Sequence, residues 1–379
     1  MKKNIHQVIA FALIIVILTT CKKPYAPPAI TAINNFLVVD GNINTAPNSS
    51  TTITLSRTRR LIDTVTNVPE LYAQVYIESS QGNKYVVHAT SGGKYISDQL
   101  TLSPSDTYRL DITTNDGKNY KSEFVRVIET PAIDSLNWKR DKDVTIYVTS
   151  HDPQNDTRYY KWDYDETWEY HAFYQTDLGV NNGMIFYRDT ITQAFKCWSN
   201  AASTDIILGT SVKLSDDVIS KIPVAIVPEN SSKIDFRYSI LVKQIGLTKE
   251  AYDYWQILQK NTQQLGTLFD AQPSQLVGNI SCTNNPGEPV IGFIGASSTQ
   301  QKRLFISNRE LSNWHGGTPG TACNLQFTTI NPTNYLIFDY PDTTYGPYYF
   351  ITGGGMAVAK RQCLDCTLNG GTNNKPAFW

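Results

Sequence analysis

Short apolar runs separated by turn residues follow one another over residues 36–130, and their spacing constrains the fold more than any other feature of the chain. Leu110 and Ile112, for example, alternate with polar residues, and an Asp116-Gly117 turn follows. Alternation places every second side chain on one face of a strand, and Asp-Gly is a strong signal for a hairpin turn. Several strands at near-regular spacing are typical of an immunoglobulin-like β-sandwich, which we predict for this region.

Residues 131–379 are predicted to form a larger, β-rich second domain with one amphipathic helix near 248–270. Thr248 suits the helix N-cap, and apolar residues such as Trp255 and Leu258 then recur at helical spacing. The whole chain is therefore expected to be mainly β, with the immunoglobulin-like sandwich first and the helix-bearing domain second.

The first twenty residues have the pattern of a bacterial lipoprotein signal peptide. An unbroken apolar run, Val8–Leu18, follows two lysines and is too short to span about 30 Å of hydrocarbon comfortably. It leads to Cys21. We predict that the signal peptide is cleaved off just before Cys21 and that this cysteine is acylated with fatty acids, which anchor the protein to a membrane. Residues 21–35 then form a proline-containing tether. Two alternatives stay open: an ordinary secretory signal with an incidental cysteine, and an uncleaved anchor.

The charge balance argues against one class of partner. The chain has 33 lysine and arginine residues against 34 aspartate and glutamate residues, which gives a net charge of -1. A protein that binds nucleic acid through its overall charge needs a clear excess of basic residues. We therefore expect no nucleic-acid partner.

Five cysteines besides Cys21 are the candidates for disulfide formation in an oxidising compartment. They are Cys197, Cys282, Cys323, Cys363 and Cys366. Because five is odd, at least one thiol stays free or pairs outside the chain. We favour a structural disulfide that involves Cys363, Cys366 or both. Free buried thiols and a metal or redox site are alternatives, although scattered histidines offer no zinc spacing, so no metal site is assigned.

No familiar catalytic motif occurs in the sequence, and neither a cofactor nor a catalytic residue is assigned. One acidic stretch leaves an enzymatic alternative open. Asp163, Asp165, Glu166 and Glu169 lie among aromatic residues. A glycan or peptide hydrolase could use two such carboxylates if they lie about 5–10 Å apart beside a substrate.

Aromatic side chains form the weak candidate ligand site. Tyrosine and tryptophan can stack on a sugar or a peptide while their polar ends form hydrogen bonds. The candidates are Trp162, Trp168, Tyr170, Tyr348 and Tyr349. In a half-buried sandwich the same residue types are ordinary core, and that alternative stays open.

Short motifs in a particular order resemble one known family. In chain order they are Cys21, Phe36–Gly41, Pro131–Ser135, Cys197-Trp198, Tyr238–Gln244, Ala251–Trp255, Gln272–Ser274, Gly278–Ile280, Gly292-Phe293, Lys302-Arg303, Cys363–Cys366, Gly370–Thr372 and Lys375–Trp379. Through them the chain is similar to the Bacteroidota outer-membrane lipoprotein family catalogued as domain of unknown function 4249.

The resemblance implies an outer-membrane lipoprotein whose gene often lies beside that of a TonB-dependent transporter. It implies a non-catalytic accessory or binding role in nutrient uptake, with an oligosaccharide or a peptide as the candidate ligand. No catalytic residue is established for the family, so none is carried over. Acidic residues after the lipidated cysteine often accompany surface export, whereas Lys22 and Lys23 follow Cys21 here. The periplasmic and the cell-surface face of the outer membrane both stay open.

Overall fold

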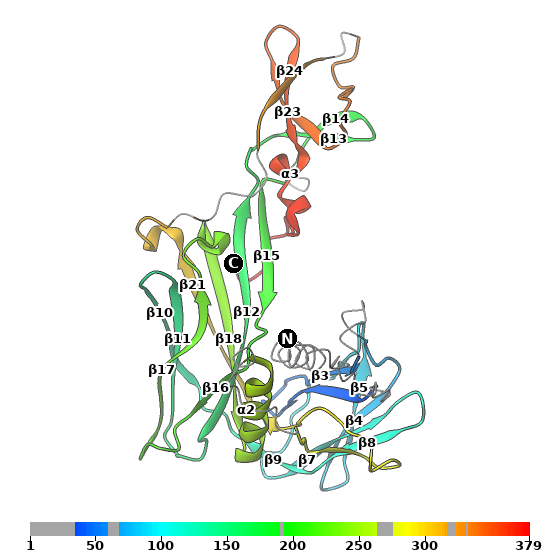
Figure 1. The fold of residues 1–379 in the computed structure, drawn as a ribbon, viewed down its shortest axis with the longest axis vertical. Coiled ribbons are helices and arrows are strands. Elements are labelled where there is room, and N and C mark those ends of the chain that lie inside the picture. Colours follow the sequence, from blue (N-terminus) through cyan, green and yellow to red (C-terminus); the bar gives the residue numbers. More distant parts are fainter. Residues whose placement is uncertain are drawn as a thin grey trace, which may run out of the picture.

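The computed structural model describes residues 35–59, 68–189, 193–263, 276–314, 316, 323–330 and 333–379. The described chain is mainly β with a sandwich architecture, so the predicted fold class is confirmed. Figure 1 shows a first sandwich beside the lower end of an upright second sandwich, and a small lobe that extends from the upper end of the second. The predicted signal peptide, Cys21 and all of the tether except Asn35 lie outside the described residues.

The first sandwich contains the strands predicted for residues 36–130. Its strands are β1 Leu37–Gly41, β2 Ile43–Asn44, β3 Thr52–Arg57, β4 Gln74–Ser79, β5 Lys84–Ala89, β6 Lys94–Ser97, β7 Thr107–Thr113, β8 Asn119–Ser122, β9 Val125–Ile128, β19 Ile280–Cys282 and β20 Ala296–Ser297. They form an 11-stranded sheet that wraps around one apolar core. The predicted hairpin joins β7 to β8, and Gly117 in its turn has a positive φ of 81°.

The division of the chain differs from the expected one first in the segment that carries β19 and β20. We expected everything after residue 130 to belong to the second domain, but β19 and β20 return to the first sandwich. β19 pairs with β8, and β20 lies between β9 and β2 in parallel pairings. Ile280 and Ile294 from this segment are buried in the first core. Strand pairing between segments so distant in the chain leaves no local pattern, which is why the sequence does not reveal it.

The second sandwich packs a three-stranded sheet against a five-stranded sheet. The first sheet contains β10 Ile133–Arg140, β11 Val144–Asp152 and β17 Asp217–Val227. The second contains β12 Tyr159–His171, β15 Lys196–Ala202, β16 Ile207–Thr210, β18 Arg237–Leu247 and β21 Thr299–Ser307. Two short 3₁₀ helices, η1 Ser232–Ile234 and η2 Asn308–Glu310, accompany them. Val144, Ile146 and Val148 alternate along β11, and all three lie in this core.

Helix α2, Lys249–Gln263, stands beside the lower end of the second sandwich, on the side that faces the first sandwich (Figure 1). The Ala251 N–H donates to the Thr248 hydroxyl oxygen at 3.2 Å, as expected of an N-cap. The predicted helix reached residue 270, and residues 264–270 lie outside the described part of the chain.

The lobe has its own small apolar core and is built from two distant parts of the chain. Its elements are β13 Leu178–Asn181, β14 Met184–Tyr187, β22 Gln326–Thr329, β23 Tyr345–Ile351, β24 Gly355–Lys360, the short helix α3 Arg361–Leu364 and the 3₁₀ helix η3 Cys366–Asn369. The sequence-based division included these residues in the second domain. The structure places them in a separate body, because the hairpin between β12 and β15 packs on the C-terminal strands.

Candidate functional site

A cleft lies where the two sandwiches and helix α2 meet. It encloses about 380 Å³ between the end of β1, strands β12 and β18, α2 and the segment that carries Phe293. This volume is in the range of small-ligand pockets, and a junction between domains is a common place for them. The cleft is the candidate functional site of the protein.

Two glycines let the backbone close one wall of the cleft. Gly41 has a φ of 145°, and a Cβ there would lie 2.6 Å from the Thr52 carbonyl oxygen. Gly292 has a φ of 152°, and a Cβ there would meet the carbonyl oxygen of Val39. A residue other than glycine is strained in this region of φ. The close approach lets Phe293 line the cleft while the next residue is buried in the first core.

Strand β12 supplies the charged wall through simple alternation. Tyr160 and Trp162 point into the core of the second sandwich, while Lys161, Asp163 and Asp165 line the cleft. The sequence pattern predicts this separation of an aromatic face from a charged face. It does not predict that the charged face forms the wall of a cavity.

Both lysines in the cleft are engaged with aspartates. Lys161 Nζ donates to the two carboxylate oxygens of Asp163 at 2.7 and 2.6 Å. Lys243 Nζ, on the neighbouring strand, lies 2.5 Å from Asp165 Oδ2. These ion pairs hold four charged side chains in defined positions along one wall.

Asp40 is the third carboxylate of the cleft and has a different environment. Its side chain is exposed, but neighbouring protein atoms partly bury its carboxylate. This burial raises the pKa of Asp40 above its ordinary value, and the opposing effects of the Lys161 charge and the Gly41 N–H are smaller. Within the described residues, no lysine, arginine or histidine lies within ion-pair distance of Asp40.

Aromatic rings complete the cleft. Trp255 on α2 and Phe293 line it, and Lys161 Nζ lies 4.8 Å from the centroid of the Trp255 ring. Behind them, the Tyr254 ring centroid lies 5.5 Å from that of Phe293. Burial and the nearby Asp40 charge raise the pKa of Tyr254 to about 12, so its hydroxyl stays protonated near neutral pH.

The four acidic residues of the enzymatic alternative do not gather in one place. Asp163 and Asp165 line the cleft, whereas Glu166 points into the second sandwich. Glu166 accepts a hydrogen bond from the Tyr238 hydroxyl at 2.6 Å and pairs with Lys233 at 2.5 Å.

Glu169 lies further along β12, next to the C-terminal residue. It contacts His171 Nε2 at 2.9 Å and Lys196 Nζ at 3.0 Å, and accepts a hydrogen bond from Trp379 Nε1 at 3.2 Å. Burial alone would raise its pKa. The hydrogen bonds from Lys196 and His171 outweigh this effect and lower the pKa below the ordinary value.

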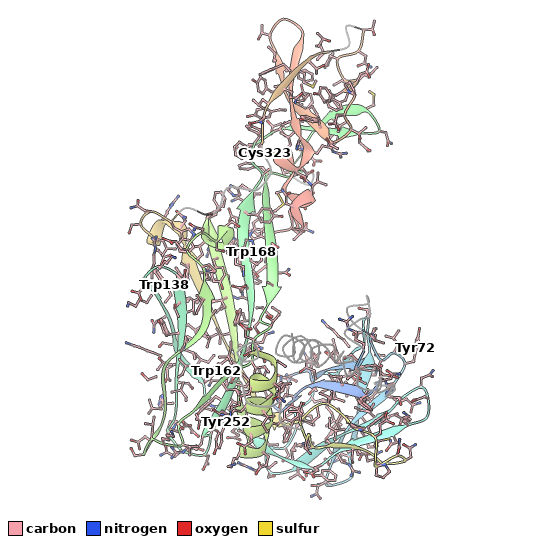
Figure 2. All side chains as sticks on the ribbon, viewed as in Figure 1. Tyr72, Trp138, Trp162, Trp168, Tyr252 and Cys323 are labelled. Atoms are coloured by element: carbon pink, nitrogen blue, oxygen red, sulfur yellow. A yellow bond between two sulfur atoms is a disulfide. The ribbon has the colours of Figure 1, made fainter. Side chains whose placement is uncertain are left out.

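The predicted ligand aromatics are scattered, and none of them lines the cleft. Trp162 is a correction: it is fully buried, its indole N–H donates to Gln244 at 2.8 Å, and it offers no face to a ligand. Trp168 is half-buried against the same core, with Lys233 Nζ 5.0 Å from its ring centroid. Figure 2 shows both tryptophans on the second sandwich.

The three predicted tyrosines lie away from the cleft, at the neck and in the lobe. The Tyr170 hydroxyl donates to the Cys366 carbonyl oxygen at 2.7 Å. Tyr348 packs against the small core around Cys363, and Tyr349 is exposed beside it. Alternation along a strand cannot distinguish a ligand-facing aromatic from a core aromatic, so the sequence alone does not place these side chains.

Four of the five candidate cysteines form two disulfides at the neck of the lobe. Cys197 pairs with Cys366, and Cys323 pairs with Cys363. The two cysteines of the C-x-x-C motif therefore bond to different distant partners rather than to each other. Cys282 is buried and unpaired in the first sandwich. Figure 2 marks Cys323 at the base of the lobe.

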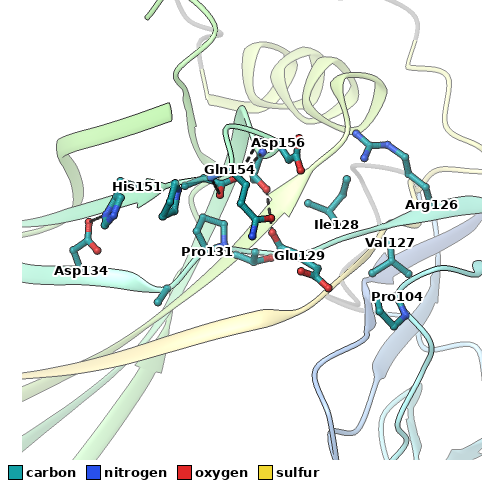
Figure 3. A pocket seen from close by; sticks show the side chains of 15 residues that line it. Pro104, Arg126, Val127, Ile128, Glu129, Pro131, Asp134, His151, Gln154 and Asp156 are labelled. Atoms are coloured by element: carbon teal, nitrogen blue, oxygen red, sulfur yellow. Dashed lines mark hydrogen bonds and ion pairs between the residues drawn. The ribbon is translucent and has the colours of Figure 1, made fainter. Parts of the chain in front are cut away.

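A second cavity, of about 680 Å³, lies at the hinge between the two sandwiches (Figure 3). One of its carboxylates, Asp152, accepts the backbone N–H groups of Gln154, Asp156 and Thr157 at 3.0, 3.0 and 2.9 Å. Asp152 thereby stabilises a polar turn. The residues that line this cavity include the His151 imidazole but no tyrosine, tryptophan or phenylalanine. The smaller cleft combines charge with aromatic surface and is the better candidate.

The described residues hold no group of three or more histidine, cysteine, aspartate or glutamate side chains placed to bind a metal ion. In the same part of the chain, no helix has both the length and the apolar character needed to cross a membrane.

The fold and the cleft define a protein built from two β-sandwiches that enclose a ligand-sized cavity at their junction. A family model described as domain of unknown function (DUF4249) matches residues 22–303, and the chain belongs to this family. The match ends within β21, before the C-terminal strands of the lobe.

No curated protein matches the sequence. Among solved structures, the chain is similar to a two-domain fibronectin type-III segment of chicken tenascin, with 11% identity and a TM-score of 0.16. The similarity covers 55% of this chain and 90% of the tenascin segment.

Proposed function

We propose that this protein is a non-catalytic accessory or binding protein, anchored to the outer membrane by lipid on Cys21, that works with a TonB-dependent transporter in nutrient uptake. The signal sequence and family membership support the setting in the cell envelope. In this proposal the cleft between the sandwiches holds the ligand.

One observation carries the binding role: the cleft combines pre-positioned charged groups with aromatic surface. Asp163 and Asp165 each have a lysine ammonium at hydrogen-bond distance, which restricts the motion of these carboxylates. Positioned polar groups and aromatic walls are the usual means by which a small-ligand site selects its ligand. Both features serve binding, and neither depends on a chemical reaction of the ligand.

The membrane setting predicts a specific partner in cells. Crosslinking in cells, followed by purification of this protein from outer membranes and mass spectrometry, is expected to recover a β-barrel transporter. The matched control is Cys21→Ser, which removes the acylation site and is expected to release the protein from the membrane fraction. A wild-type protein that is recovered reproducibly alone, or a Cys21→Ser protein that stays in the membrane, would contradict the proposal.

A second candidate function is the hydrolysis of a glycan or a peptide in the same cleft. It is favoured by the two carboxylates of Asp163 and Asp165, whose Cα atoms are about 7 Å apart because they are two residues apart in a strand. If the protein is a hydrolase, Asp163→Asn or Asp165→Asn abolishes turnover in a panel of polymers, while Asp141→Asn in an exposed turn does not. Absence of turnover by the wild-type protein across the panel excludes this alternative and agrees with the binding role.

A further inference from the structure

The cleft has one more carboxylate than it has cations. Among the residues that line it, Lys161 is paired with Asp163 and Lys243 with Asp165, and Asp40 is left over. A carboxylate without a paired cation attracts an opposite charge, and the protein walls of a cleft screen that attraction less than bulk water does. The cleft therefore favours a positively charged group from outside the described chain and disfavours an anion.

The protein itself shows how an ammonium group fits this cleft. The Lys161 ammonium contacts both oxygens of Asp163 and lies 4.8 Å from the Trp255 ring centroid. Carboxylate and ring thus form a cation site that a side chain of the protein already occupies. Asp40 and Phe293 both line the same cavity, and within the described residues Asp40 has no ion pair of its own.

We infer that the ligand of the cleft carries a primary ammonium group, as a lysine side chain or an amino terminus does, and that Asp40 is its counter-ion. The inference rests on the proposed function, because it names the ligand class of the same cleft. A peptide fragment has this chemistry, whereas a neutral oligosaccharide does not. Asp40 is then the residue that determines specificity, and Lys161 competes with the ligand for the negative charge.

The test measures binding to the full chain by isothermal titration calorimetry with three probes. The first is the amidated tripeptide Gly-Lys-Gly, which has two ammonium groups and no carboxylate. The second is the same tripeptide with both amines acetylated, and the third is the neutral sugar maltotriose. Acetylation removes the charge from the probe and leaves the protein unchanged, so this comparison does not depend on whether a variant folds.

Three variants complete the design. Asp40→Asn and acetylation of the probe should each weaken binding by about tenfold or more, because each removes a charge-assisted hydrogen bond. Lys161→Met should tighten binding of the charged tripeptide by about threefold or more, because it removes the competing cation. Asp141→Asn makes the same chemical change in an exposed turn and should leave the affinity unchanged.

Each alternative result overturns the inference. The inference fails if the charged tripeptide does not bind, if the acetylated form binds as tightly, or if Asp40→Asn has no effect. If maltotriose binds instead and Trp255→Ala abolishes that binding, the ligand class is wrong but the binding function stands. If none of the three probes binds, the inference is overturned, while recovery of a transporter by crosslinking tests the proposed function separately.

Discussion

Replacing both Cys197 and Cys366 with alanine is expected to lower the free energy of unfolding by about 5 kcal/mol. The bridge closes a loop with a sequence separation of 169 residues, and a cross-link over such a loop removes much conformational entropy from the unfolded chain. It also connects β15 of the second sandwich to η3 of the lobe. Thermal unfolding and limited proteolysis of the double variant measure the loss.

The second disulfide and the free cysteine provide the controls. Cys323–Cys363 closes a loop with a sequence separation of only 40 residues, so its removal is expected to cost less, about 4 kcal/mol. Its effect should be confined to the lobe, where proteolysis should begin. Cys282→Ala in the first sandwich should cost only about 1 kcal/mol. If the Cys197 and Cys366 double variant melted like the wild-type protein, the entropic argument would be refuted.

Trp162→Ala is expected to destabilise the second sandwich by roughly 5 kcal/mol, through the loss of buried area and the creation of a cavity. The ring is fully buried, and its indole N–H donates to Gln244 Oε1 at 2.8 Å. The Gln244 amide nitrogen in turn donates to the Pro131 carbonyl oxygen at 2.8 Å and to the Ser150 hydroxyl at 2.9 Å. Removal of the indole leaves a buried acceptor unpaired at the hinge. Urea unfolding measures the change.

Two comparisons separate the contributions to that loss. Trp162→Phe keeps much of the apolar volume and removes the hydrogen bond. It should therefore lower the free energy of unfolding by only part of the amount lost in Trp162→Ala. Trp168→Ala, on the same strand but half-buried, should destabilise the protein much less. If Trp162→Ala and Trp168→Ala lowered the free energy of unfolding equally, the difference in burial between the two residues would not explain their contributions to stability.

Much of the fold could be predicted where its signals are local. The alternation around Leu110 and Ile112 and the Gly117 turn predict the β7–β8 hairpin, because a hairpin pairs residues close in the chain. Thr248 predicts the beginning of α2 for the same reason, since an N-cap bonds within one turn. Alternation along β12 also separates Tyr160 and Trp162 in the core from Lys161, Asp163 and Asp165 in the cleft.

The candidate site could not be predicted in this way. Asp40, Asp163, Trp255 and Phe293 come from four segments that are far apart in the chain, and no spacing between them signals a common cavity. The aromatic character of the helix around Trp255 was the available signal, and it does not indicate which face the ring would cover. The five aromatics chosen from the sequence instead lie in a core, at the neck and in the lobe.

The sequence by itself determined the strand-and-turn character of the chain, the position of its main helix, the hinge near Pro131 and the family to which it belongs. These features depend on propensities and hydrogen bonds between residues that are neighbours in the chain. Only the tertiary structure decided that β19 and β20 complete the first sandwich, which cysteines pair, and that three carboxylates share one cleft. Those outcomes depend on packing between segments that are distant in the chain. A local sequence pattern does not reveal which of these segments pack together.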